Sequence, residues 1–329
     1  MSTTAPTSDS ALSPDAGGAH ASPLLPRDHW VSKGYQRGFA SSDQRVAVMD
    51  VSGRKIVDPR RPTKSNFAEV GFTTFVDGDE VVNELELAFA RIEKKVLNQI
   101  RDVSSSRRGS DLQGAVANLF AIHLVRSPSF KAFGKRIEAH FRGQAVDDLA
   151  ADERLPEMFQ KQFGRPPLDG ELRSMVEEQC DKLLDNPHTP AGSMARQHDA
   201  IAEKLCGFHM QVIEVDPTLP GLVLGDTPIV HADLATRRYG FRDSLAIGDA
   251  SLIIGPLTRR TAVCFTATRL PPVTITTHKA LDALNAVFIR AAVVEVACHP
   301  DDARRLQQLS ARLDRHPPHQ FLERHRRAS

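Results

Sequence analysis

Two glutamates, Glu86 and Glu93, stand seven residues apart in a segment whose apolar residues recur every three or four positions. Seven residues make about two turns of an α-helix, so both carboxylates project from one face, about 10 Å apart along the axis. Burying an unpaired carboxylate is costly, so each group needs either water or a partner. Carboxylates grouped in this way can hold a divalent cation or act as general acid and base.

Three further residues are candidates for the same site. His29 lies between Asp28 and Trp30, where an imidazole can be oriented and shielded. Arg126 ends an apolar segment directly before a Ser-Pro step, and its guanidinium keeps its charge, so it needs an anion. Asp226 lies in a Gly-Asp-Thr-Pro turn, a common loop position for functional residues. The candidate catalytic set is therefore His29, Glu86, Glu93, Arg126 and Asp226, with Glu86, Glu93 and Asp226 as candidate metal ligands.

Two interpretations of this set stay open. In the first, the carboxylates hold Mg²⁺ or Mn²⁺, because hard cations prefer oxygen ligands, and Arg126 neutralises a phosphoryl group. The protein is then a metal-dependent hydrolase acting on a phosphoester, with a nuclease as one form. In the second, Arg126 forms a structural ion pair with a glutamate, His29 bonds a backbone carbonyl, and Asp226 caps its own turn. The protein is then a non-catalytic binding or regulatory protein with a helical groove for a partner.

Both interpretations predict an ion pair between Arg126 and Glu86. A short loop over 102–110 joins the helix that carries Glu86 to the helix that ends at Arg126. Two antiparallel helices joined in this way bring the end of the second beside the start of the first, which favours Glu86 over Glu93.

The predicted secondary structure changes from strands to helices and back to strands along the chain. Apolar and β-branched runs on either side of Ser52-Gly53 predict an early β-hairpin. A helical period then dominates, and short β-branched runs follow before two last helices. The predicted helices cover 82–102, 112–125, 130–140, 156–163, 168–184, 193–206, 278–290 and 302–313, and the later predicted strands cover 210–215, 222–224, 229–231, 251–254, 262–266 and 292–297. Without regular βαβ alternation, this order predicts an α+β fold with a mainly antiparallel C-terminal sheet.

The same pattern predicts one folded unit between two tails. Residues 1–26 are rich in Ser, Thr, Ala, Pro and Gly and are expected to be a flexible tail. Residues 27–315 are expected to form a single compact α+β domain, with a helical middle over about 82–206 and a sheet over about 207–297. Residues 316–329 are expected to be a frayed basic tail.

Composition limits the classes of function. The chain has 42 Lys and Arg against 41 Asp and Glu, so it lacks the overall basic excess of a nucleic-acid coat protein. A local patch could still bind nucleic acid, and the loop with Arg101, Arg107 and Arg108 is one candidate. No apolar run is long enough for a membrane helix, and four scattered cysteines indicate reduced thiols. We therefore expect a cytoplasmic protein that does not bind a membrane.

Three ordered stretches resemble a bacterial family known as domain of unknown function 4238. They are His29 to Phe39, which is similar to the family's opening pattern; the helix with Glu86 and Glu93 followed by Arg126-Ser127-Pro128; and Gly225-Asp226-Thr227-Pro228 followed by Pro256-Leu257-Thr258. Serine, glutamine and glycine replace the family's typical proline, leucine and serine at positions 32, 36 and 225. The resemblance spans about 27–297 and implies a bacterial origin, but it implies no activity.

Overall fold

The computed structural model describes residues 25–70, 72–77, 80–100, 110–184 and 188–313. The expected N-terminal tail, apart from its last two residues, and the expected basic tail over 316–329 lie outside these ranges. The loop with Arg101, Arg107 and Arg108 also lies outside the described residues. Within the described part of the chain, no helix is long and apolar enough to cross a membrane.

The larger sheet is built by late strands. It contains β7 (His209–Val215), β9 (Val230–Asp233), β10 (Arg238–Tyr239), β11 (Leu252–Pro256), β12 (Thr261–Thr266) and β13 (Val273–Ile275), in the order β10-β9-β11-β12-β7-β13. Of these strands, β7, β9, β11 and β12 match predicted strands, and β10 and β13 do not. All neighbours are antiparallel except β13 and β7, which are parallel. The α+β class is therefore confirmed.

The predicted hairpin forms a second sheet with two later strands. It consists of β2 (Arg45–Asp50) and β3 (Lys55–Pro62), and the order of this sheet is β3-β2-β14-β8, with β8 at Leu224–Gly225 and β14 at Glu295–Cys298. The predicted strands 222–224 and 292–297 overlap β8 and β14 and so belong to this sheet rather than to the larger one. The sequence missed two short pairs, β1 (Arg27–His29) with β4 (Ala68–Val70) and β5 (Phe75–Asp77) with β6 (Glu80–Val82), because three residues are too few to show alternation.

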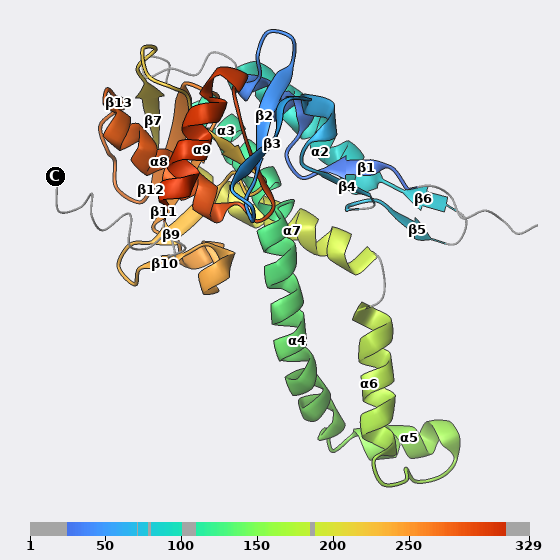
Figure 1. Cartoon of the computed structure of the whole chain (residues 1–329). Helices are drawn as coiled ribbons and strands as arrows, with labels where there is room; N and C mark the ends of the chain where they lie inside the picture. The colour runs from blue at the N-terminus through green and yellow to red at the C-terminus, as the bar shows by residue number, and fades with distance from the viewer. Residues whose placement is uncertain (1–24, 71, 78–79, 101–109, 185–187, 314–329) are drawn as a thin grey trace, which may run out of the picture.

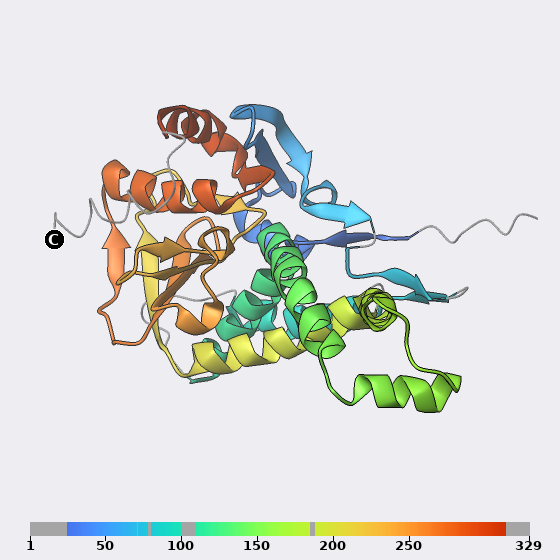
Figure 2. The same ribbon diagram turned by 90° about the horizontal axis from the view of Figure 1, so that it is seen from below.

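Helix α3 (Ser110–Val125) is the centre of the core. Its apolar residues surround the whole helix, and Val116, Leu119 and Phe120 are fully buried. Phe120 packs edge-on against Phe265 of β12, with ring centroids 5.5 Å apart. Helices α2 (Glu84–Ile100) and α7 (His188–Cys206) pack against α3, while α8 (His278–Ala291) covers the opposite side of the larger sheet (Figure 2). Helix α9 (Ala303–Arg312) lies beside α8.

Helices α4 (Pro128–Ala150), α5 (Leu155–Phe163) and α6 (Glu171–Leu184) form an arm that projects from this body (Figure 1). Helix α4 extends well beyond the predicted 130–140 and passes through Gly143, a residue that often ends a helix, and its outer half packs against α6. Val146, Phe159 and Val176 give the arm a small apolar core of its own. Salt bridges from Arg142 to Asp181 and from Arg173 to Asp147 join α4 to α6.

Candidate functional site

Arg126 is buried at the end of α3 and binds both predicted glutamates. Its Nη2 atom lies 2.9 Å from each carboxylate oxygen of Glu86, and its Nη1 atom lies 3.1 Å from Oε1 of Glu93. Thr73 donates a further hydrogen bond to Glu86, at 3.1 Å. The predicted contact between Arg126 and Glu86 is therefore confirmed, and Glu93 joins it because α2 runs alongside the end of α3.

The second carboxylate gives this network an excess of negative charge. Burial raises the pKa of Glu93 to about 7; the charge of Arg126 opposes this rise and that of Glu86 adds to it. His123, which the sequence analysis did not select, lies beside Glu93, with Nε2 3.7 Å from Oε1. Burial lowers the pKa of His123 to about 3, so this imidazole is neutral and adds no positive charge. With both glutamates ionised, the network therefore carries one negative charge more than Arg126 balances, and uptake of a proton by Glu93 removes this excess.

His29 lies at the edge of this network. Its Nε2 atom is 3.2 Å from the carbonyl oxygen of Lys64, so the expected backbone contact is present. Burial lowers the pKa of His29, and the nearby charges of Arg126 and Glu86 act on it in opposite directions. The charges of Arg126 and Glu86 therefore act on His29, while the hydrogen bond of its ring is made with the backbone of Lys64.

Asp226 is fully buried and binds the segment at the start of β14, away from Arg126 and the two glutamates. Its two oxygens accept hydrogen bonds of 2.5 to 3.1 Å from the amides of Val293, Val294 and Glu295, which lead into β14. Burial raises the pKa of Asp226 to about 6 although these amides favour the charged form. The expectation that Asp226 caps its own turn is therefore wrong, because its carboxylate binds a distant segment instead.

The predicted metal ligands do not form one coordination site. Among the described residues, no group of three His, Cys, Asp or Glu side chains is arranged to hold a metal ion. Glu86 and Glu93 face the guanidinium of Arg126, and Asp226 faces backbone amides. A donor set already bound to a cation or to N–H groups does not fit Mg²⁺ or Mn²⁺, which need free oxygen atoms.

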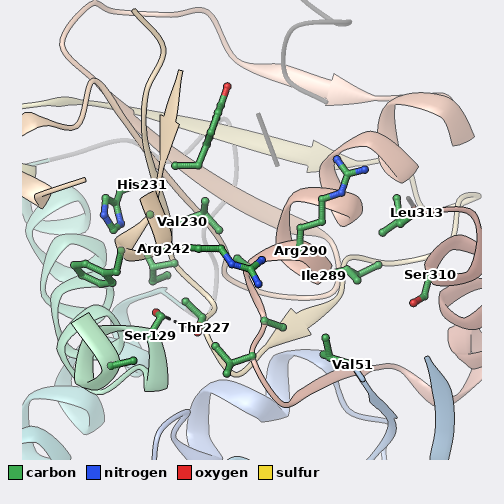
Figure 3. Close-up of a pocket in the computed structure, with 18 of the residues that line it drawn as sticks. Val51, Ser129, Thr227, Val230, His231, Arg242, Ile289, Arg290, Ser310 and Leu313 are labelled. Carbon is green, nitrogen blue, oxygen red and sulfur yellow. Dashed lines mark hydrogen bonds between the residues drawn. The ribbon is translucent and has the colours of Figure 1, made fainter. Parts of the chain in front are cut away.

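A cavity of about 380 Å³ lies elsewhere, at the start of α4 (Figure 3). We call it the arginine pocket, because its described lining contains Arg54, Arg136, Arg242 and Arg290 and neither Asp nor Glu. Apolar side chains from β9 and α8, including Val230 and Ile289, form its walls. The pocket therefore combines a strong positive charge with an apolar surface.

The arginines of this pocket come from four separate elements. Arg54 lies in the turn of the β2–β3 hairpin, Arg136 lies on α4, Arg290 lies at the end of α8, and Arg242 belongs to the short helix η3 (Phe241–Asp243). Arg54 and Arg136 donate to the carbonyl oxygens of Leu313 and Phe241, at 2.6 and 2.5 Å. Within the described part of the chain, none of Arg54, Arg136 and Arg242 has a carboxylate in salt-bridge range. Arg242 is exposed and extends into the pocket (Figure 3).

Two of the sequence stretches singled out above meet at this pocket. Ser129 follows Arg126-Ser127-Pro128 and stands in the first turn of α4, and Thr227 belongs to the Gly-Asp-Thr-Pro turn. Their hydroxyl oxygens are 3.4 Å apart (Figure 3). The pair places two hydroxyls and the positive end of the α4 dipole beside the arginines, which suits an anion.

Phe241 holds η3 in place as one wall of the pocket. Its ring packs on Phe133 and Phe130 of α4, with centroids 5.2 and 5.3 Å away, and on His231, 4.5 Å away. Burial lowers the pKa of His231 to about 4, so this imidazole is neutral near pH 7. The charge of the pocket therefore comes from its arginines.

Sequence reasoning missed these arginines because they are far apart along the chain and share no motif. The nearest signals were Thr227, which is adjacent to Asp226, and Ser129, which stands three residues after Arg126. The hydrogen bonds of Asp226 to the β14 segment and of Arg126 to Glu86 hold in position the two segments that carry these pocket residues.

A family model described as "Protein of unknown function (DUF4238)" matches residues 27–302. This range covers the three stretches on which the resemblance was based. No curated protein and no solved structure matches the chain.

Proposed function

The chain belongs to the DUF4238 family, and we propose from its residues that it binds a small phosphate-bearing ligand in the arginine pocket. The observation that carries this proposal is the set of arginines that converge on one cavity whose described lining contains no acidic side chain. Of the two functions expected from the sequence, this supports a non-catalytic binding or regulatory protein.

Phosphate fits the pocket better than a carboxylate does. A guanidinium presents a planar fork of donors that matches two phosphate oxygens, and several such forks neutralise a ligand with more than one negative charge. The hydroxyls of Ser129 and Thr227 and the start of α4 add donors at one wall. The apolar residues Val230 and Ile289 can pack against the organic part of the ligand.

The residues expected to perform hydrolysis support a structural role instead. Glu86 and Glu93 are engaged by Arg126, and Asp226 is engaged by amides of the β14 segment. A phosphoester hydrolase would need a base or an activated water beside the phosphate, and the described pocket lining contains neither Asp, Glu nor Cys. His231 does line the pocket, but burial lowers its pKa to about 4, which makes it a weak base, and its Nε2 atom lies 3.1 Å from the carbonyl oxygen of Leu245. Binding without hydrolysis is therefore the outcome that we expect, and detection of hydrolysis would contradict it.

Titration calorimetry with inorganic pyrophosphate and with adenosine diphosphate tests the binding. Arg242→Ala removes an exposed guanidinium that extends into the pocket, and we expect affinity to fall about tenfold or more, the usual loss for a charge-assisted contact. Arg91→Ala, on the exposed side of α2, is the control and should leave affinity unchanged. Absence of binding, or equal losses in both variants, would contradict the proposal.

The same samples test the hydrolase hypothesis. The ligands are incubated with Mn²⁺ and with a chelator, and release of inorganic phosphate is measured for the wild type and Glu93→Gln. The binding proposal predicts no chelator-sensitive release. Release that needs Mn²⁺ and disappears in Glu93→Gln would establish the metal-dependent hydrolase and overturn the non-catalytic role.

A further inference from the structure

A second depression of about 450 Å³ lies at the opposite end of the β2–β3 hairpin from Arg54, and it is distinct from the arginine pocket. We call it the basic groove. It is formed by the first helical segment, α1 (Lys33–Gln36) with η1 (Arg37–Phe39), and by the loops that flank β2 and β3. Its described lining residues are Lys33, Arg37, Asp43, Gln44, Arg45, Pro62, Thr63 and Lys64.

The positive charge of the basic groove is not neutralised. Asp43 is its acidic lining residue, and Arg60 and Arg45 contact its carboxylate at 2.7 and 3.4 Å. Lys33, Arg37 and Lys64 are exposed, and the described residues place no carboxylate within salt-bridge range of them. Three free cations therefore surround an acid that other arginines already bind.

This charge is concentrated in one stretch of a chain that is nearly neutral overall. Residues 27–64 contain nine Lys and Arg, four Asp and no Glu, whereas the formal charge of the whole protein is +1. The remainder of the chain is therefore slightly acidic. Four of these nine cations, Lys33, Arg37, Arg45 and Lys64, line the basic groove together with the single acid Asp43, and this local excess produces a positive potential that attracts a polyanion.

Buried neighbours fix the backbone that carries these cations. Lys33 and Arg37 are one helical turn apart, roughly 6 Å along the axis, and Tyr35 and Phe39 of the same segment are buried. On the other side of the groove, the amide of Thr63 donates to the carbonyl oxygen of Gln44, at 3.1 Å. The lysine and arginine side chains of the groove therefore project from backbone segments that are held in place on both sides.

We propose that the basic groove binds the phosphodiester backbone of a nucleic acid without reading its bases. Phosphates are contacted through Lys and Arg, and such contacts account for most of non-specific nucleic-acid binding. The described lining contains no aromatic side chain on which a base could stack. A protein partner would need an apolar core at the interface, and Pro62 is the one apolar residue in the described lining of the groove.

Fluorescence anisotropy with labelled 20-nucleotide DNA, as a single strand and as a duplex of mixed sequence, tests this site. We expect binding at 50 mM salt that weakens steeply toward 200 mM. The slope of log affinity against log salt should be about −3 to −4 for the duplex, corresponding to about four phosphate contacts. The two variants carry equal changes of charge: Lys33→Glu with Arg37→Glu in the groove, and Lys161→Glu with Arg304→Glu at exposed sites elsewhere.

The groove variant should lose at least tenfold in affinity, while the control should change by less than about twofold. Thermal melting of both variants monitors folding, and Lys64→Glu alone provides an independent test from the other wall. Equal losses in groove and control variants, or no binding at 50 mM salt, would overturn the proposal. Tighter binding to polyglutamate or to anionic phospholipid vesicles than to DNA would also overturn it. Pyrophosphate binding in the arginine pocket is measured separately, so the two sites can fail independently.

Discussion

Arg126 illustrates how a buried charge is accommodated at the scale of single residues. Its side chain is 1% exposed, and Glu86 and Glu93 supply three of its contacts. Glu86 keeps about a quarter of its side chain in water, so it is the better solvated partner. Because Arg126 stands two residues before α4, these contacts also fix the segment that leads to Ser129 at the arginine pocket.

Removing this guanidinium should be costly. Arg126→Ala leaves two carboxylates near each other in a buried place, and we expect the free energy of unfolding to fall by about 3–5 kcal/mol. Urea unfolding followed by circular dichroism measures the change. Arg142→Ala breaks the exposed bridge to Asp181 and should cost less than about 1 kcal/mol. Similar losses in the two variants would show that Arg126 is not buried as described.

Glu93 should make stability depend on pH. Burial raises its pKa from 4.5 to about 7, so between these values the folded protein binds more protons than the unfolded chain. The free energy of unfolding should therefore fall as pH rises through this window, by at most about 1.4 kcal/mol per pH unit from this group. Urea unfolding between pH 5 and 8 measures the slope, and Glu93→Gln should make it shallower. An unchanged slope in this variant would contradict the raised pKa.

At the scale of elements, the turn after β8 is tied to the segment before β14. Asp226 accepts hydrogen bonds from the amides of Val293, Val294 and Glu295, and the neighbouring strands β8 and β14 pair directly. Val293 also lines the arginine pocket, as does Thr227. The carboxylate therefore holds together two segments that form one wall of the pocket.

Loss of this carboxylate should weaken both the fold and the pocket. Asp226→Ala leaves backbone amides without an acceptor, and we expect a loss of at least about 3 kcal/mol in the free energy of unfolding, with weaker pyrophosphate binding. The matched control is Asp233→Ala, whose carboxylate caps an exposed turn at Ala235 and Thr236 and should cost less than about 1 kcal/mol. A small loss in Asp226→Ala would contradict the proposed link.

At the scale of the whole molecule, the outer arm is separate from the pocket. Figure 1 shows α5 and the outer parts of α4 and α6 extending away from the two sheets. The arm residues that line the arginine pocket, Ser129, Ala132 and Arg136, all lie in the first half of α4. The outer arm exposes apolar side chains such as Phe141, Met158 and Phe163, which makes it a surface that a partner could contact.

Removing the tip of the arm should leave the body folded. Replacing residues 144–176 with a short glycine-rich turn deletes the arm's own core, Val146, Phe159 and Val176, but no described lining residue of the pocket. We expect a cooperative thermal transition and pyrophosphate affinity within about twofold of the full chain. Calorimetry measures both. Loss of cooperative unfolding would show that the arm is an integral part of the core.

Much of the fold follows from local pattern. The central position of α3 follows from its apolar residues, and the hairpin over Arg45–Pro62 follows from β-branched runs around Ser52-Gly53. Chain order alone predicted the contact between Arg126 and Glu86, because a short connection makes two helices antiparallel neighbours. The end of α4 could not be predicted, because it depends on packing against α6 rather than on a stop signal.

Local sequence pattern was enough to predict the α+β class, the helical middle and the late antiparallel sheet, because each depends on short-range periodicity. The chemistry of one side chain was enough to predict that Arg126 needs an anion. Tertiary structure alone decided that Asp226 binds amides near β14 and that Arg54, Arg136, Arg242 and Arg290 converge on one cavity. These residues are brought together by sheet pairing and helix packing across long stretches of chain. No local pattern encodes such contacts, because their energies depend on which distant surfaces meet.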